Sequence, residues 1–181
     1  MGLVEAKMKI LEVLWSEGSP MKPKDVAEKA GLKVPAATMH LLGLKKSGYV
    51  QTPQHGVYAI TELGKEIIGL PKIDKGHAAK ILGHVPTDKA FHFYTGMNQY
   101  THVIAHSLGE FVDKLQKIDV KSVEFHVPRK DFEQWVQSLG DTELAKKLVA
   151  IRNMHIHGEN LRTRLYEAVK HRLEELKRIH G

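Results

Sequence analysis

Residues 31–60, GLKVPAATMHLLGLKKSGYVQTPQHGVYAI, decide the fold of the N-terminal part of the chain. Apolar residues recur at helical spacing after the first glycine, which predicts a helix over residues 35–46. Two short β-prone runs follow, residues 49–54 and residues 57–61. They are joined at His55-Gly56, a pair that favours a tight turn, so the stretch predicts a helix followed by a β-hairpin.

Further helices are predicted on both sides of this stretch. Residues 3–16 have an amphipathic helical pattern, and residues 22–30 begin with Pro23 in the first turn, where its missing N–H costs nothing. After the hairpin, Thr61 is placed to cap a helix over residues 62–70. The predicted order is therefore three helices, a hairpin and a fourth helix.

This order, with the runs GLKVPAATMHLLGLKKSGYV and VYAITELGKEII, resembles a winged helix-turn-helix domain of the prokaryotic repressor type, over residues 1–70. The resemblance implies double-stranded DNA as partner, with the helix over residues 35–46 in the major groove and the hairpin as the wing. It also implies a homodimer that reads two half-sites. Lysines would anchor phosphates, and Thr38 would meet base edges. The expected DNA-binding residues are Lys22, Lys24, Lys33, Pro35, Thr38, Met39, Lys45, Lys46, Gln54 and His55.

The same helix also fits a second interpretation. Val34, Met39 and Leu42 stand where polar side chains would be expected to read bases. Apolar residues at these positions suit a protein-interaction module that uses the winged fold without reading DNA. Burial of Met39 and Leu42 by another part of the protein would favour the interaction module, and exposure would favour DNA binding.

Composition narrows the function classes. The 181 residues are 42% hydrophobic and 27% charged, as in ordinary globular proteins. Because there is no cysteine, disulfides, thiolate metal sites and cysteine nucleophiles are excluded, which suits a cytoplasmic protein. No stretch predicts a signal peptide or membrane span. The net charge of +6 favours polyanionic partners, but residues 1–70 hold only nine Lys against seven Asp or Glu, so the charge is not concentrated in the winged region.

Beyond a connector over residues 71–89, the pattern predicts a small α/β domain over residues 90–157. Residues 90–94 and 121–126 alternate as strands, and the long apolar stripe between them predicts a crossover helix and hence a parallel pair. Two capped helices follow. Asp131 is predicted to cap a helix over residues 132–139, with Gln134 completing a capping box, and Asp141 to cap a helix over residues 142–152. The core candidates in these helices are Trp135, Leu139, Leu144 and Leu148.

Residues 91–152, with FHFY, SLGEF and SVEFHVPRKDFEQWVQSLGDTELAKKL, resemble a family of uncharacterised archaeal domains often found beside winged helices. The resemblance implies a fold unit and no activity. Residues 158–181 then form a basic helix whose apolar stripe fits either dimerisation or packing on its own domain. The predicted fold class is mainly α with small β: a winged helix-turn-helix, an α/β domain and a long terminal helix.

Few residues suggest chemistry. Tyr94, His126 and Trp135 lie near predicted strand ends and are candidates for a small-molecule effector pocket. His102 and His106, four apart on the predicted long helix, are the weak metal candidates in a chain for which no metal site or cofactor is otherwise expected. No nucleophile elbow, phosphate-cradling glycine loop or paired-carboxylate motif is present, so the sequence predicts a DNA-binding regulator and not an enzyme.

Overall fold

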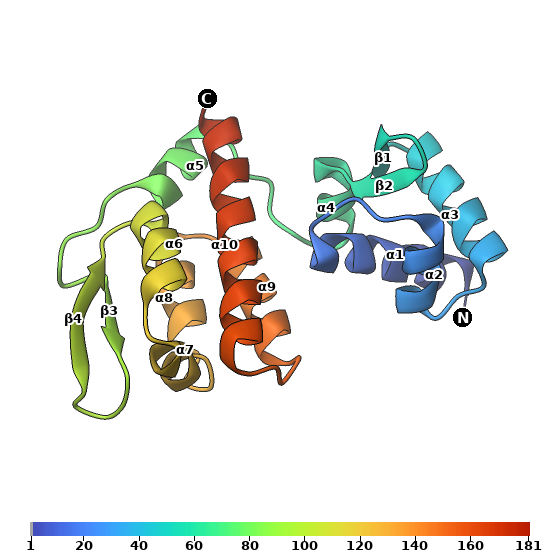
Figure 1. Cartoon of the computed structure of the whole chain (residues 1–181). Coiled ribbons are helices and arrows are strands. Elements are labelled where there is room, and N and C mark those ends of the chain that lie inside the picture. The colour runs from blue at the N-terminus through green and yellow to red at the C-terminus, as the bar shows by residue number, and fades with distance from the viewer. Residues whose placement is uncertain (1) are drawn as a thin grey trace. The chain divides into compact units, whose positions relative to one another are not determined.

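The computed structural model describes residues 2–181, and the chain divides into two compact units, Met1–Lys72 and Ile73–Gly181. It is mainly helical, at 61% of residues, with two small antiparallel sheets (Figure 1). No helix among the described residues is long and apolar enough to cross a membrane. The first unit, called unit 1, consists of α1 (Leu3–Glu17), α2 (Pro23–Ala30), α3 (Val34–Lys46), β1 (Val50–Gln54), β2 (Val57–Ile60) and α4 (Glu62–Ile67).

Local signals explain the helices of unit 1. α1 ends at Gly18 and α2 at Gly31, which both adopt the left-handed conformation that glycine tolerates, with φ of 69° and 68°. Thr61 caps α4, because its Oγ1 accepts a hydrogen bond of 3.1 Å from the Gly64 N–H. The predicted bounds of the first three helices agree with the structure to within one residue, whereas α4 ends earlier than predicted.

The hairpin of unit 1 is tied to the segment between α1 and α2. β1 and β2 pair in antiparallel register, with Val50 opposite Ile60. Met21 and Tyr58 exchange two backbone hydrogen bonds of 2.8 Å each. The three longer helices and the hairpin enclose one apolar core, which includes Ile10, Leu14, Val26, Leu41, Leu44, Val50 and Tyr58.

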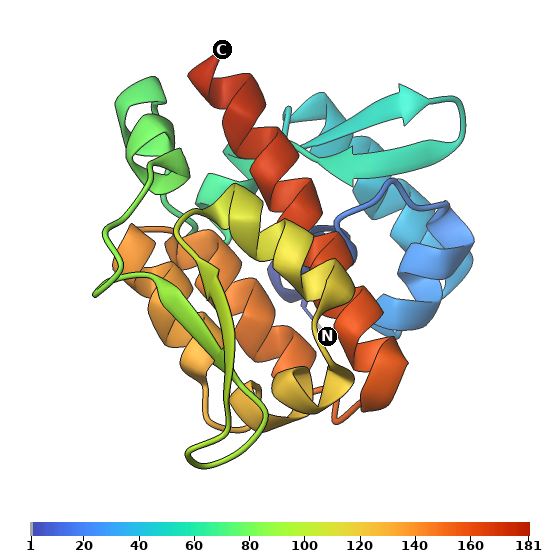
Figure 2. The same cartoon turned by 60° about the vertical axis from the view of Figure 1, so that its left-hand side comes forward.

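The second unit, called unit 2, is built around its long C-terminal helix. α10 packs against α5, α6, α7 and α9, and Figures 1 and 2 both show it alongside α6. Most of its apolar stripe is buried in the core, so the helix is packed on its own unit. The elements of unit 2 are α5 (Lys75–Leu82), β3 (Phe91–Tyr94), β4 (Tyr100–Ala105), α6 (Leu108–Lys117), α7 (Val120–His126), α8 (Asp131–Leu139), α9 (Thr142–Arg152) and α10 (Gly158–His180).

The predicted parallel strand pair of unit 2 is wrong. The first strand, β3, is present, but it pairs in antiparallel register with β4, which lies inside the region predicted as a long helix. The chain reverses through Gly96 and Asn98, whose φ is 59°, and β-branched residues follow. The segment predicted as the second strand is instead a helix, α7. Asp119 caps this helix by accepting a hydrogen bond of 2.9 Å from the Lys121 N–H.

Two further predictions about unit 2 need correction. Asp131 does not cap α8; it is the first helical residue, and Lys130 occupies the cap position with φ of 65°. The predicted capping box with Gln134 does not form either, because the cap residue Lys130 makes no side-chain capping hydrogen bond. By contrast, Asp141 caps α9 as predicted, accepting a hydrogen bond of 3.0 Å from the Leu144 N–H. All four predicted core residues, Trp135, Leu139, Leu144 and Leu148, are buried.

Candidate functional site

The outward side of α3 is a largely apolar surface. Val34, Met39 and Leu42 are 44%, 60% and 54% exposed, although large apolar side chains normally gain free energy by leaving water. They share a helix face with Pro35 and Thr38, while Leu41 and Leu44 fill the core on the opposite side. These five residues, Val34, Pro35, Thr38, Met39 and Leu42, are called the α3 face.

Lysines lie at both ends of α3 and at the start of α2. Lys22, Lys24, Lys33, Lys45 and Lys46 are all exposed. None of them forms an ion pair with another residue that the structure describes, whereas Lys29 of α2 pairs with Glu17 at 3.0 Å. Each of the five ammonium groups is therefore available to an external anion.

The N-termini of α2 and α3 share an unusual feature. Each helix starts after a lysine, Lys22 or Lys33, whose side chain makes no capping hydrogen bond, and each has a proline in its first turn. First-turn N–H groups without a side-chain cap, at the positive end of the helix dipole, favour phosphate oxygens. Two such helix ends with adjacent lysines suit contacts to a sugar-phosphate backbone.

The polar residues predicted to meet DNA differ in their availability. Gln54 and His55 are exposed at the tip of the hairpin, where Gly56 takes a φ of 80°. The Thr38 hydroxyl, however, donates a hydrogen bond of 2.9 Å to the Val34 carbonyl oxygen. Thr38 is therefore not a free donor, and sequence inspection gave no sign of this bond.

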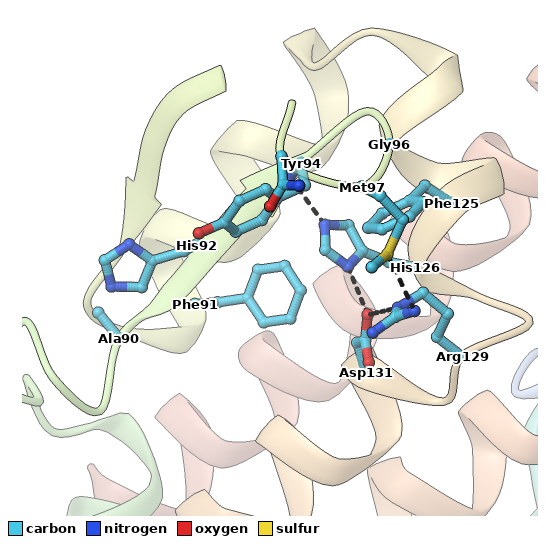
Figure 3. A pocket seen from close by; sticks show the side chains of 11 residues that line it. Ala90, Phe91, His92, Tyr94, Gly96, Met97, Phe125, His126, Arg129 and Asp131 are labelled. Carbon is cyan, nitrogen blue, oxygen red and sulfur yellow. Dashed lines mark hydrogen bonds and ion pairs between the residues drawn. The ribbon is translucent and has the colours of Figure 1, made fainter. Parts of the chain in front are cut away.

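Unit 2 contains a pocket of about 410 Å³ between the β3–β4 hairpin and the end of α7 (Figure 3). Its walls are largely apolar, and at its edge the Arg129 guanidinium is paired through Nε with Asp131 Oδ2 at 3.1 Å. The Arg129 Cζ lies 4.9 Å from the centre of the Phe125 ring, and this side chain is about half exposed. The pocket is lined by Ala90, Phe91, His92, Tyr94, Gly96, Met97, Asn98, Phe125, His126, Arg129 and Asp131.

His126 is the buried polar centre of the pocket wall (Figure 3). Its Nε2 accepts a hydrogen bond of 2.9 Å from the Tyr94 backbone N–H, so Nδ1 carries the proton and donates to Asp131 Oδ2 at 2.8 Å. Burial, with a smaller contribution from the Arg129 charge, lowers the pKa of His126 against the opposing effect of Asp131. Both ring nitrogens are occupied, so His126 fixes the hairpin to α7 and is not free to act as a general base.

Two of the three residues predicted for the effector pocket lie at the pocket of unit 2. Tyr94 and His126 line it, but Trp135 does not. The Trp135 indole instead packs in the core and donates a hydrogen bond of 2.9 Å to the Lys89 carbonyl oxygen. The sequence does not predict Met97 as a pocket residue, because the pattern around it favours a helix, whereas the structure has a turn there.

Comparison with known proteins places the chain in a family. A model described as a family of unknown function (DUF5752) matches residues 54–170. The chain belongs to this family. No curated protein and no solved structure matches it.

The DUF5752 match covers one of the two candidate sites and not the other. Every residue that lines the pocket lies within residues 54–170, as does most of unit 2. The helices α1, α2 and α3 precede the matched region. The pocket therefore belongs to the part of the chain that defines this DUF5752 member, whereas the α3 face lies outside it.

The histidine pair proposed as a weak metal site does not form. His102 lies in β4, with φ of 59°, and its ring packs against Tyr100 at a centroid distance of 4.8 Å. His106 follows the end of β4 and hydrogen-bonds to Glu110. The helical spacing that joined the two histidines was wrong because this segment is a strand.

Proposed function

We propose that the chain is a DNA-binding transcriptional regulator in which unit 1 acts as a winged helix-turn-helix domain. In this proposal α3 enters the major groove of double-stranded DNA and the β1–β2 hairpin is the wing. The observation that carries it is the open α3 face, flanked by five exposed lysines without ion-pair partners among the described residues.

Phosphate contacts supply most of the affinity in this proposal. Lys22 and Lys33 bring positive charge to the uncapped starts of α2 and α3, while Lys45 and Lys46 serve the end of α3. Each neutralised phosphate releases condensed counterions, so binding should weaken steeply as salt rises. Exposed Gln54 and His55 add wing contacts.

Base reading would be weaker and largely apolar. Since the Thr38 hydroxyl already donates to Val34, Met39 and Leu42 are left to contact thymine methyl groups. We therefore expect modest discrimination between sequences. A homodimer would compensate for the weak base reading, because the binding free energies of its two half-sites add. Since α10 is packed on unit 2, another surface would have to form the dimer.

A second candidate function is favoured by the same apolar side chains. An exposed apolar helix face, here Val34, Met39 and Leu42, is also the kind of surface that docks a partner protein. In that case unit 1 is a protein-interaction module. The two functions differ in salt dependence, because apolar docking releases no counterions from DNA.

Unit 2 would supply the regulatory input. The pocket suits a small molecule with an aromatic or apolar body and one anionic group, which would lie beside Arg129 while its body contacts Met97 and Phe125. We assign no catalytic step, because His126 is engaged at both ring nitrogens.

A gel shift with the DNA upstream of the protein's own gene tests the proposed function. We expect the full chain to retard this duplex at low salt and to release it as salt rises. Met39→Ala should leave much of this binding intact, whereas joint replacement of Lys33 and Lys45 by alanine should weaken it markedly, because two phosphate contacts are lost. Absence of any shift at low salt would contradict the DNA-binding function and favour the interaction module.

A further inference from the structure

Two histidines and a glutamate meet beside the start of α6. His84 follows α5, His106 follows β4, and Glu110 lies in the first turn of α6. Their nearest ligand atoms all lie within 4.8 Å of one another. Within the described part of the chain, this is the one group of three such residues that meets so closely.

Backbone hydrogen bonds hold these three residues together. The Val85 N–H donates to the His106 carbonyl oxygen at 2.8 Å, which joins the loop carrying His84 to the end of β4. The His106 N–H donates to Glu110 Oε2 at 2.8 Å, and Ser107 Oγ accepts from the Glu110 N–H at 3.2 Å. The cluster is therefore built on three fixed segments.

The side chains present one carboxylate oxygen to each ring. Glu110 Oε2 lies 3.3 Å from His106 Nδ1, and Glu110 Oε1 lies 3.8 Å from His84 Nε2. The two imidazole rings are stacked, with centroids 4.9 Å apart and planes 6° from parallel. Thr87 Oγ1 lies 3.4 Å from His106 Nε2, the nitrogen that faces away from the carboxylate.

We propose that His84, His106 and Glu110 bind one divalent transition-metal ion of the zinc class. Two imidazole nitrogens and one carboxylate oxygen form a donor set that zinc, cobalt and nickel accept, with water completing the coordination. His106 would bind through Nδ1 and keep its Nε2–H for Thr87, as metal-bound histidines commonly do with a neighbouring oxygen.

The geometry allows this with a small side-chain adjustment. Ligand atoms around a tetrahedral zinc ion lie about 3.3 Å apart, given zinc–nitrogen distances of about 2.0–2.1 Å. His84 must close the larger gap, and its side chain is 68% exposed, so its rotation is not blocked by core packing. Harder ions such as magnesium prefer all-oxygen sites and should not compete.

A metal-free explanation accounts for only part of the cluster. Glu110 accepts the His106 N–H and so helps to start α6, and this bond lowers the pKa of the carboxyl group. That role uses Oε2 alone. It leaves unexplained why Oε1 faces a second imidazole from another segment of the chain.

Calorimetric titration of the full chain with zinc chloride tests the proposal. We expect one zinc ion per chain, and at least about tenfold weaker binding in His84→Ala and Glu110→Gln. Glutamine retains an acceptor for the His106 N–H, so α6 should still start normally. His102→Ala is the matched control, because His102 is exposed in β4 and outside the cluster.

Histidine ring NMR with cobalt chloride identifies the ligands independently of the substitutions. The ring signals of His84 and His106 should be perturbed before those of His102 or His155. The proposal is overturned if zinc does not bind the unmodified chain, if both cluster variants bind it as tightly as the control, or if other histidine signals respond first. These results would not bear on DNA binding, since the cluster lies in unit 2.

Discussion

Arg172 of α10 and Asp141 at the start of α9 form a bidentate ion pair inside unit 2. Arg172 Nε lies 2.8 Å from Asp141 Oδ2, and Nη2 lies 3.0 Å from Oδ1. Burial alone would lower the pKa of Arg172, but Asp141, Glu143 and Glu175 raise it above its usual value. Because Asp141 also caps α9, one buried carboxylate both starts that helix and joins it to α10.

Arg172→Met should destabilise unit 2 strongly. Removing one partner leaves Asp141, which is fully buried, without its counter-charge, and such losses typically cost about 3–5 kcal/mol. Urea denaturation of the full chain followed by circular dichroism measures the effect. Arg178→Met is the control, because Arg178 is exposed near the end of the same helix. Equal stability of the two variants would show that the ion pair contributes little.

Two glycines of unit 1 should respond oppositely to alanine. In α4, a Cβ at Gly64 would overlap the Tyr49 carbonyl oxygen, so Gly64→Ala must displace the hairpin or the helix. In α3, a Cβ at Gly43 meets nothing within 4 Å, so Gly43→Ala should stabilise by about 0.5–1 kcal/mol through helix propensity. Thermal denaturation compares them, and a stable Gly64→Ala protein would contradict the close packing of α4 on the hairpin.

Acid should weaken unit 2 through His126. Burial lowers the pKa of His126 in the folded state, so below the ordinary pKa of about 6.5 the unfolded chain binds the proton more readily. The stability is therefore fully present above that value and declines as the pH falls from it through the folded pKa. We expect a steeper loss of urea stability between about pH 7.5 and 5.5 in the unmodified chain than in His126→Gln. Parallel curves would contradict this origin.

The pocket should prefer anionic aromatic molecules. We expect 1-naphthoate to shift the NMR signals of Met97 and Tyr94, and the neutral 1-naphthamide to bind at least about fivefold more weakly, because a charge-assisted bond to Arg129 adds about 1 kcal/mol or more. Arg129→Gln should remove this preference. Equal binding of the two probes to the unmodified chain would argue against an anion-selective pocket.

Sequence patterns predicted some elements of this chain much better than others. α2 and α3 have a proline in the first turn, α1 and α2 end at a glycine, and the hairpin turns at Gly56, so the bounds of these elements were predictable. The capping of α9 by Asp141 was equally predictable. The elements between Gly96 and His126 were not predictable in this way. Their apolar residues fit a helical period, although the β-branched residues and Asn98 favour a hairpin. Short apolar runs such as the one that forms α7 suit strand and helix alike.

The candidate sites were only partly predictable for the same reason. The lysines around α3 are exposed, as their sequence positions suggested. The hydrogen bond from Thr38 to Val34 and the partnership of His126 with the Tyr94 backbone depend on side-chain rotamers and long-range pairing. The cluster of His84 with Glu110 joins residues from different elements. No local spacing rule reveals such contacts.

Fluorescence anisotropy over a range of salt concentrations tests DNA binding by unit 1 most directly, with a labelled duplex taken from the DNA upstream of the protein's own gene. We expect binding at low salt, with a logarithmic salt slope whose magnitude falls by about 0.9 for each phosphate contact removed. Lys33→Ala and Lys45→Ala should each reduce the slope by about one contact, while Lys9→Ala, on exposed α1 surface, should leave it unchanged. No binding at low salt, or slopes that Lys33 and Lys45 do not affect, would contradict DNA binding by unit 1.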